Sequence, residues 1–227
     1  MQSAEWRTLH SALCNSTSHP SSFPAMRIAI IGAGKVGMAL GHGWARERRD
    51  IVFGVRNPAG REVLIGRAAG IPEAVRDAEV VVLATPWAAV DSALAAAGPL
   101  DGRILVDCTN PILPGMAGLS LGTTESAAER IAALVPRCRV VKAFNTTGAG
   151  NMANPRFGAE RLTMCYCGDD AEAKRTVEQL IVSLGFTPVD AGGLQAARYL
   201  EPLAMLWIHL AYRMGHGPNI GLHLVRR

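Results

Sequence analysis

The sequence predicts an α/β fold, a doubly wound and mainly parallel sheet that is extended by a C-terminal βαβ unit and by terminal helices. Three observations lead to this prediction. Short apolar runs alternate with helix-like segments from Met26 onward. A glycine-rich turn, "GAGKVG", joins the first apolar run to the first helix-like segment. The run "EVVVLA" at residues 79–84 is almost entirely β-branched and apolar, as buried strands of parallel sheets are.

The elements of the first two thirds of the chain follow from this alternation. The expected strands are residues 27–31, 51–55, 79–84, 103–107 and 139–144. The expected helices are residues 35–48, 87–97 and 126–134. In the first of these helices, Val36, Leu40 and Trp44 share one face at helical spacing. Residues 61–78 fit a short helix, a third strand and another helix start, and residues 111–121 read as turn-rich and mobile.

The last third of the chain repeats the strand–helix–strand order. Residues 161–169 read as a strand, residues 170–185 as a helix with a glycine at its end, and residues 186–192 as a strand. This βαβ unit is expected to extend the same sheet. From Leu194 onward the pattern is mostly helical, with an interruption expected near Pro202 because proline lacks a backbone N–H.

Composition excludes several classes of function. Of 227 residues, 49% are hydrophobic and 19% are charged, which favours a well-buried core over a disordered chain. The net charge of +4 is mild and no dense basic cluster stands out, so no nucleic-acid partner is expected. The late apolar stretch "PLAMLWIHLAYRMG" is too short for a bilayer and contains His209 and Arg213, so no membrane insertion is expected either. The first residues do not resemble a secretory signal, and we expect a cytoplasmic protein.

The five cysteines do not predict a metal site. Their number is odd and their spacings match no zinc pattern. Cys165 and Cys167 lie two apart in an expected strand, so both side chains should point to one face. We interpret the cysteines as small buried apolar residues in a reducing compartment.

The glycine-rich turn predicts a dinucleotide-binding site of the Rossmann type. Gly32 allows a tight turn after the strand, Gly34 allows a pyrophosphate to approach the backbone, and Gly37 allows close packing of helix and sheet. With Ala33, Lys35 and Val36 these glycines form the phosphate loop at a helix start. The alternative is an ordinary glycine-rich turn, but the position between a strand and a helix favours the dinucleotide site.

The second expected strand ends in Arg56 and Asn57, where a protein that binds NAD usually carries an acidic residue. A carboxylate accepts hydrogen bonds from the adenosine ribose, whereas a guanidinium makes charge-assisted bonds to a phosphate on that ribose. Arg56 therefore predicts NADP(H) as the cofactor, with Asn57 supplying an amide nearby. Arg61 is a candidate for a second cation. The alternative for Arg56 is a solvated surface residue.

Three further turns follow expected strands and should meet at the same sheet edge. The first contains Thr85 and Pro86, after the strand at residues 79–84, and the second contains Asn110, after the strand at residues 103–107. The third contains Phe144 and Asn145, where the strand at residues 139–144 ends. In open α/β sheets ligands bind at the carboxyl ends of the strands. Short polar side chains and free amides there suit a nicotinamide and its ribose, although Thr-Pro and Asn-Pro are also plain turn formers.

These motifs divide the chain into three parts. Residues 1–25 are expected to be a poorly ordered extension, because they are rich in serine and contain Pro20 and Pro24. Residues 26–193 are the expected NADP-binding domain with its extended sheet. Residues 194–227 are the expected helical segment, which forms either part of an acceptor pocket or a dimer contact.

The motifs also resemble those of the coenzyme F420-dependent NADP oxidoreductases, a domain type shared with the cytosolic part of STEAP metalloreductases. The resemblance is carried by "IAIIGAGKVGMAL", "GVRNP", "VVVLATPW", "LVDCTNP", "VVKAFNT", "CGDDAEAK" and "LGFTPVDAG". It implies that Val55, Arg56 and Asn57 receive the adenosine phosphate of NADP. It also implies that the turns at Thr85 and at Phe144 border the nicotinamide.

The expected function is hydride transfer between NADP(H) and a second ring system, either a deazaflavin (coenzyme F420) or a flavin. In such chemistry the cofactors make and break the bonds while the protein supplies geometry, so no catalytic residue is assigned. His42 and His209 are candidate proton donors, and Met205, Trp207 and Met214 are candidates for an acceptor pocket, a core or an interface of a homodimer. The alternatives are NADPH-dependent reduction of a small imine, ketone or ferric complex, and a non-catalytic NADP(H) sensor.

Overall fold

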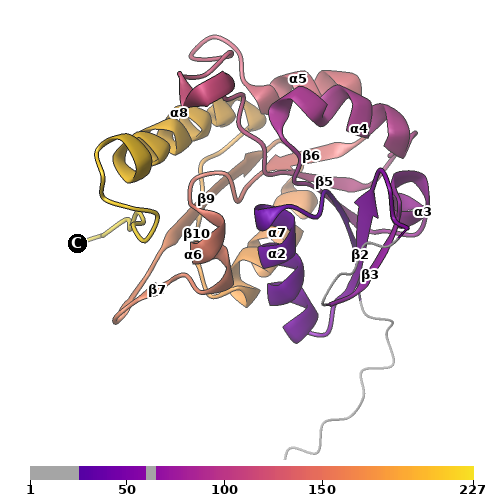
Figure 1. The fold of residues 1–227 in the computed structure, drawn as a ribbon, viewed down its shortest axis with the longest axis horizontal. Coiled ribbons are helices and arrows are strands. Elements are labelled where there is room, and N and C mark those ends of the chain that lie inside the picture. Colours follow the sequence, from indigo (N-terminus) through magenta and orange to yellow (C-terminus); the bar gives the residue numbers. More distant parts are fainter. Residues whose placement is uncertain (1–25, 60–64) are drawn as a thin grey trace, which may run out of the picture.

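The computed structural model describes residues 26–59 and 65–227, and a single eight-stranded sheet dominates this part of the chain (Figure 1). The spatial order is β10-β9-β6-β5-β4-β1-β2-β3, and all neighbours are parallel except β9, which pairs antiparallel with β6. The predicted fold class is confirmed, including the C-terminal βαβ unit, β9-α7-β10, which extends the sheet. The N-terminal extension and Arg61 lie outside the described residues.

The sheet strands coincide closely with the apolar runs of the sequence. They are β1 (Arg27–Ile31), β2 (Asp50–Val55), β3 (Arg67–Gly70), β4 (Val80–Leu83), β5 (Ile104–Asp107), β6 (Arg139–Lys142), β9 (Thr163–Gly168) and β10 (Thr187–Asp190). All residues of β4 and β5 are buried, as expected for central strands covered on both faces.

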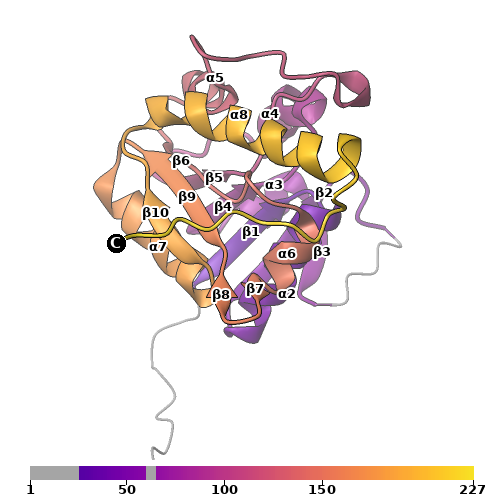
Figure 2. The same ribbon diagram turned by 90° about the vertical axis from the view of Figure 1, so that its left-hand side faces the viewer.

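Helices cover both faces of the sheet (Figure 2). On one face lie α2 (Lys35–Arg46), α6 (Ala149–Ala153) and α7 (Ala171–Ser183), and on the other lie α3 (Ile71–Val75), α4 (Val90–Ala97), α5 (Ala127–Leu134) and α8 (Ala197–Ile208). Alternate residues of β1 serve the two layers: Ile28 and Ile30 pack with α2 and α7, whereas Ala29 and Ile31 pack with α3 and α4. Each side of the sheet therefore has its own apolar core.

Local signals fix several helix starts. Ser126 caps α5 with a reciprocal capping box, in which Glu129 accepts from the Ser126 N–H at 2.9 Å. Asp170 caps α7 by accepting from the Ala173 N–H at 2.7 Å. Cys165 and Cys167 face the same core, as the strand pattern predicted.

The structure corrects three expected helices. Helix α2 ends at Arg46 rather than at residue 48, because Arg48 takes a left-handed backbone conformation with φ of 59°. The expected helix at residues 87–97 begins with a 3-10 turn, Trp87–Ala89, before α4. The interruption near Pro202 was wrong, since Pro202 lies inside α8. Proline removes one helical N–H, and burial of the neighbouring Glu201 and Ala204 keeps that turn packed on the sheet.

Sequence patterns missed the segment between β6 and β9 and the path of the C-terminal residues. The first contains α6 and a small hairpin of β7 (Arg156–Phe157) and β8 (Glu160–Arg161). After α8 and a π-helical turn at His209–Arg213, the chain crosses back over the sheet edge (Figure 2). There the Thr163 N–H donates to the Leu222 carbonyl at 2.9 Å, and Asn151 Nδ2 donates to the Ile220 carbonyl at 2.8 Å. These contacts join residues too far apart in the sequence for periodicity to reveal.

Candidate functional site

The glycine turn between β1 and α2 has the geometry of a phosphate loop. Gly32 has φ of 110°, and a Cβ there would lie 2.5 Å from the Ala84 carbonyl oxygen. A Cβ on Gly37 would clash with the Gly32 carbonyl oxygen. Gly34 differs, because a Cβ there would meet no atom within 4 Å. Gly32 and Gly37 are therefore needed for packing, whereas Gly34 leaves open space beside the backbone.

A first cavity of about 480 Å³ opens in front of this turn. It is lined by the glycine turn, the end of β2, the turn after β4 and the near face of α4. Among the expected site residues it gathers Gly32, Ala33, Gly34, Arg56, Asn57, Thr85 and Pro86. Lys35, Val36 and Gly37 lie just beyond, in the first turn of α2, and do not line it. The glycine turn and Arg56, which the sequence predicted to share one site, therefore line the same cavity.

The charge and polarity of the first cavity fit the phosphates of a dinucleotide. The side chains of Arg56 and Asn57 are exposed at its rim, and within residues 26–59 and 65–227 they have no hydrogen-bond or ion-pair partner. The first turn of α2 carries no acidic residue and no side-chain cap, so its N–H groups are available to an anion. In the turn after β4, the hydroxyl oxygen of Thr85 is buried and has no partner among the residues that the structure describes. Each feature leaves a donor or a cation for a ligand.

A second cavity of about 730 Å³ adjoins the first and shares Thr85 and Pro86 with it. It is lined by apolar side chains and by the turn after β5. Its lining residues are Thr85, Pro86, Trp87, Ala88, Cys108, Thr109, Asn110, Ile112, Leu113, Pro114 and Ser120. Asn110 is therefore the expected site residue that belongs to this cavity alone. The two cavities thus lie side by side along the carboxyl ends of β1, β4 and β5, with Thr85 and Pro86 in the wall of both.

The turns after β5 and β6 are joined by a pair of amides. Asn145 Nδ2 donates to Asn110 Oδ1 at 3.0 Å, and Asn110 Nδ2 donates to the Asn145 carbonyl at 3.0 Å. Asn145 is buried, and its Oδ1 has no hydrogen-bond partner within the described part of the chain. Phe144 has φ of 59°, and its ring is buried between Trp44 and Phe186 rather than in either cavity. Phe144 thus shapes the turn through its backbone, and Asn145 carries the polar group.

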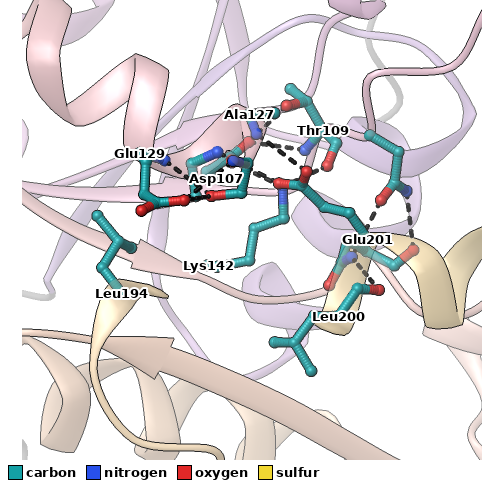
Figure 3. A network of polar contacts seen from close by, with 12 residues as sticks. Asp107, Thr109, Ala127, Glu129, Lys142, Leu194, Leu200 and Glu201 are labelled. Atoms are coloured by element: carbon teal, nitrogen blue, oxygen red, sulfur yellow. Dashed lines mark hydrogen bonds and ion pairs between the residues drawn. The ribbon is translucent and has the colours of Figure 1, made fainter. Parts of the chain in front are cut away.

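A buried lysine holds the turn after β5 from below (Figure 3). Lys142, at the end of β6, donates from Nζ to Asp107 Oδ2 at 2.8 Å, to the Thr109 carbonyl at 2.6 Å and to Glu201 Oε1 at 2.8 Å. Asp107 Oδ1 in turn accepts from the Thr109 N–H at 2.8 Å and from its hydroxyl at 2.7 Å. All three donors of the ammonium group and both oxygens of Asp107 are paired.

Glu201 closes this network from helix α8. It is 1% exposed, and its Oε2 accepts from the Ala127 N–H at 2.9 Å while its Oε1 accepts from the Ala128 N–H at 3.2 Å. It therefore also neutralises the positive end of α5. Burial alone lowers the pKa of Lys142, but the Asp107 and Glu201 carboxylates outweigh burial and raise that pKa above its ordinary value. The lysine is charged at neutral pH.

Sequence reasoning missed this network of Asp107, Lys142 and Glu201. The signal that could have found it is a charge inside an apolar run, as in "ILVDC", "VVKAF" and "RYLEPLAML". Charged residues are almost never fully buried unless they are paired, so three such runs in one domain indicate mutual contact. Which charges meet depends on the strand order, and the sequence does not show it.

The other candidate residues lie away from the two cavities. His42 lies in α2, and its buried Nε2 has no partner in residues 26–59 and 65–227, whereas His209 is exposed at the end of α8. Trp207 is buried, and its Nε1 donates to the Ile220 carbonyl at 2.9 Å, whereas Met214 is exposed. No described helix has the length and apolarity to cross a membrane, and the described residues contain no cluster of three or more metal-ligating side chains.

Comparisons with known proteins show what this chain is similar to. A family model described as NADP oxidoreductase, coenzyme F420-dependent, matches residues 27–111, from β1 through the turn after β5. Metalloreductase STEAP3 of Rattus norvegicus is 36% identical over 188 residues, which are 80% of this chain and 37% of that protein. The chain therefore spans well under half of the metalloreductase. The F420-dependent NADP reductase of Methanothermobacter thermautotrophicus is 28% identical over 213 residues, 83% of this chain and 90% of that protein.

A crystal structure assigned as an F420-dependent NADP reductase, from Arthrobacter sp. FB24, superposes with a TM-score of 0.82 at 32% identity. The match covers 89% of this chain and 100% of that chain. The resemblance seen in the sequence motifs is thereby confirmed over almost the whole fold. The chain belongs to the family of coenzyme F420-dependent NADP oxidoreductases, whose members are NADP-dependent enzymes.

Proposed function

We propose that this protein transfers hydride between NADP(H) and a deazaflavin, coenzyme F420, or a flavin. The observation that carries the proposal is the pairing of the two cavities. The first has a glycine turn and the Arg56 guanidinium, which has no side-chain partner among the described residues. The second is a larger, mostly apolar space that adjoins the first at Thr85 and Pro86. Family membership and the F420-dependent NADP reductase of Methanothermobacter thermautotrophicus support the same acceptor.

In this proposal the residues of the first cavity hold the adenosine and pyrophosphate parts of NADP(H). The N–H groups at the start of α2 and the open space at Gly34 receive the pyrophosphate. Arg56 pairs with the phosphate on the adenosine ribose, and the side-chain amide of Asn57 adds a hydrogen bond. The hydroxyl of Thr85 and the side-chain amides of Asn110 and Asn145 hold the ribose and nicotinamide. Among the described residues the Thr85 hydroxyl oxygen and Asn145 Oδ1 have no hydrogen-bond partner, whereas the amide of Asn110 is paired with Asn145.

The second cavity is proposed to hold the acceptor ring. Trp87, Ile112, Leu113 and Pro114 offer an apolar surface on which a flat ring can stack. When bound, NADPH supplies a hydride from its dihydronicotinamide, so that it is oxidised while the acceptor ring is reduced and takes a proton from solvent. Cys108 stays a neutral thiol, because burial first and Asp107 second raise its pKa, and so it does not compete as a nucleophile.

A metal complex is the second candidate acceptor, because the metalloreductase STEAP3 is 36% identical to this chain. A small imine or ketone is a third chemical class that the second cavity has room for. A non-catalytic NADP(H) sensor would need the first cavity but would not need a second cavity for an acceptor. The size of the second cavity favours the enzyme.

Dimer formation is proposed through the outer face of α8. Tyr199 is 75% exposed and Leu206 is 50% exposed on this helix, and Tyr212 beyond it is 54% exposed. A helix with large apolar side chains in water favours contact with another chain. The proposal predicts a homodimer in solution, measured by analytical ultracentrifugation of the full chain, with conversion to monomer in Leu206→Glu. A parent protein that sediments as a monomer at all concentrations refutes it.

The experiment that tests the proposed function follows NADPH oxidation by absorbance with four acceptors in parallel. These are coenzyme F420, free flavin mononucleotide, a ferric chelate and a cyclic imine. Fast oxidation with coenzyme F420 or flavin alone supports the proposal, and oxidation with the ferric chelate or the imine alone replaces it with that alternative. NADPH binding without oxidation by any of the four leaves the sensor as the function.

A further inference from the structure

Two loops of the proposed nicotinamide region are held from the same turn of helix α8. The turn after β5 is reached from Glu201 through Lys142, which donates to the Thr109 carbonyl at 2.6 Å. The turn after β6 is held by Leu200, the residue before Glu201, because Asn145 Nδ2 donates to the Leu200 carbonyl at 3.1 Å. Figure 3 shows Leu200 and Glu201 side by side, below the turn that contains Thr109.

From this geometry we infer that Glu201 is a positioning residue. It holds the wall of the second cavity in place relative to the first cavity. The expected effect of Glu201 on the reaction rests on the proposed function, whereas its structural role does not. Glu201 itself lines neither cavity. It acts through Lys142 on the backbone of Thr109, and so on Cys108 and Asn110 in the cavity wall. Removing its charge should leave the first cavity as it is and loosen the second.

The chemistry of the contacts makes Glu201 hard to replace. Both of its oxygens accept hydrogen bonds, from Lys142 Nζ and the Ala128 N–H on one and from the Ala127 N–H on the other. A glutamine would have to turn its NH₂ group toward one of these donors. Glu201→Gln therefore removes a charge from a buried pair and also sets a donor against a donor, with little change in volume.

A nearby ion pair provides a matched control. Arg198, one turn before Pro202 in α8, donates to Glu129 of α5 from Nε at 2.9 Å and from Nη2 at 2.7 Å. This pair also joins α8 to α5. Neither side chain contacts Lys142 or a residue of the second cavity in the described hydrogen bonds and ion pairs. Arg198→Met thus weakens the same helix junction without touching the turns.

The test compares the parent, Glu201→Gln and Arg198→Met by amide hydrogen exchange without any ligand. We expect exchange in Glu201→Gln to rise about tenfold or more in peptides covering residues 108–120 and 144–148, with the glycine turn and residues 55–57 unchanged. Arg198→Met should leave the two turns as in the parent. Unchanged exchange in the two turns of Glu201→Gln overturns the inference, as does an equal rise in Arg198→Met.

Ligand measurements on the same variants separate this inference from the proposed function. Adenosine 2′,5′-bisphosphate, which the proposed function assigns to the first cavity alone, should bind Glu201→Gln within about twofold of the parent. Single-turnover oxidation of NADPH, with the acceptor that the parent reduces, should slow about 10- to 100-fold. Equal losses in both refute a selective positioning role. A parent that binds no NADP(H) refutes the proposed function, and the exchange result still decides the inference. If Glu201→Gln does not fold, Glu201→Asp, which keeps the charge and shortens its reach, is measured with the same criteria.

Discussion

The first and second cavities share an edge but are built in opposite ways. At the first, the charged group is exposed and has no side-chain partner among the described residues, as Arg56 shows. Beneath the second, the charges of Asp107, Lys142 and Glu201 are fully buried and fully paired. Exposed, unpaired charge is free to bind a ligand, whereas buried, paired charge holds a shape. We therefore expect changes at the first cavity to alter binding and changes beneath the second to alter stability and geometry.

The largest effect should come from Lys142→Met, which leaves two carboxylates buried without their cation. We expect a loss of about 3–5 kcal/mol in the free energy of unfolding, measured with urea at neutral pH. Because the pKa of Lys142 is raised in the folded state, its stabilisation is complete below the ordinary lysine pKa of 10.5 and is lost as pH rises through the raised value. The difference between variant and parent should therefore shrink at strongly alkaline pH. A loss below about 1 kcal/mol would show that the lysine is not structural.

The next effect concerns Gly34, whose Cβ position points into open space. Gly34→Val should weaken NADPH binding by more than about 100-fold, since the added side chain occupies the place of the pyrophosphate. The melting temperature should stay close to that of the parent. Gly150→Val is the control, because Gly150 in α6 also has no atom within 4 Å of its Cβ position and lines neither cavity. Retained affinity in Gly34→Val, measured by isothermal titration, would mean that the glycine turn binds no phosphate.

A smaller and more selective effect is expected at the rim of the first cavity. Arg56→Glu should weaken NADPH by about 10- to 100-fold, because a charge-assisted bond is replaced by repulsion between a carboxylate and a phosphate. NADH, which lacks that phosphate, should change by less than about threefold. Dissociation constants from fluorescence titration of both nucleotides provide the comparison. Similar losses for both would remove Arg56 from phosphate recognition.

The smallest effect is expected from Arg198→Met at the junction of α5 and α8. Its partner Glu129 is partly exposed, so the melting temperature should fall by no more than about 2–4 °C. The hydrogen bond from Arg198 holds the pKa of Glu129 below its ordinary value, although burial acts the other way. The pair therefore stabilises the fold above the ordinary glutamate pKa of 4.5, and this stabilisation is lost as pH falls through the lowered pKa. The melting temperatures of the parent and of Arg198→Met should therefore converge as pH falls through the acidic range.

The sequence predicted the first cavity better than the second. Gly32, Gly34, Arg56 and Thr85 lie near one another because each follows a strand of a parallel sheet, and strand ends can be read from apolar runs. The buried network could not be predicted in this way, since Glu201 meets Lys142 across 59 positions of the chain. Its contacts depend on how α8 returns over the sheet, and no local pattern encodes that path. For the same reason the buried ring of Phe144 could not be told apart from a ring in the cavity.

The most direct test of the account is the affinity of the parent protein for adenosine 2′,5′-bisphosphate against adenosine 5′-monophosphate, measured by isothermal titration. The two ligands differ only in the phosphate that Arg56 is proposed to bind. We predict at least about tenfold tighter binding of the bisphosphate, with a preference that weakens as salt is added. Equal affinity for the two nucleotides would contradict the assignment of the first cavity to NADP(H).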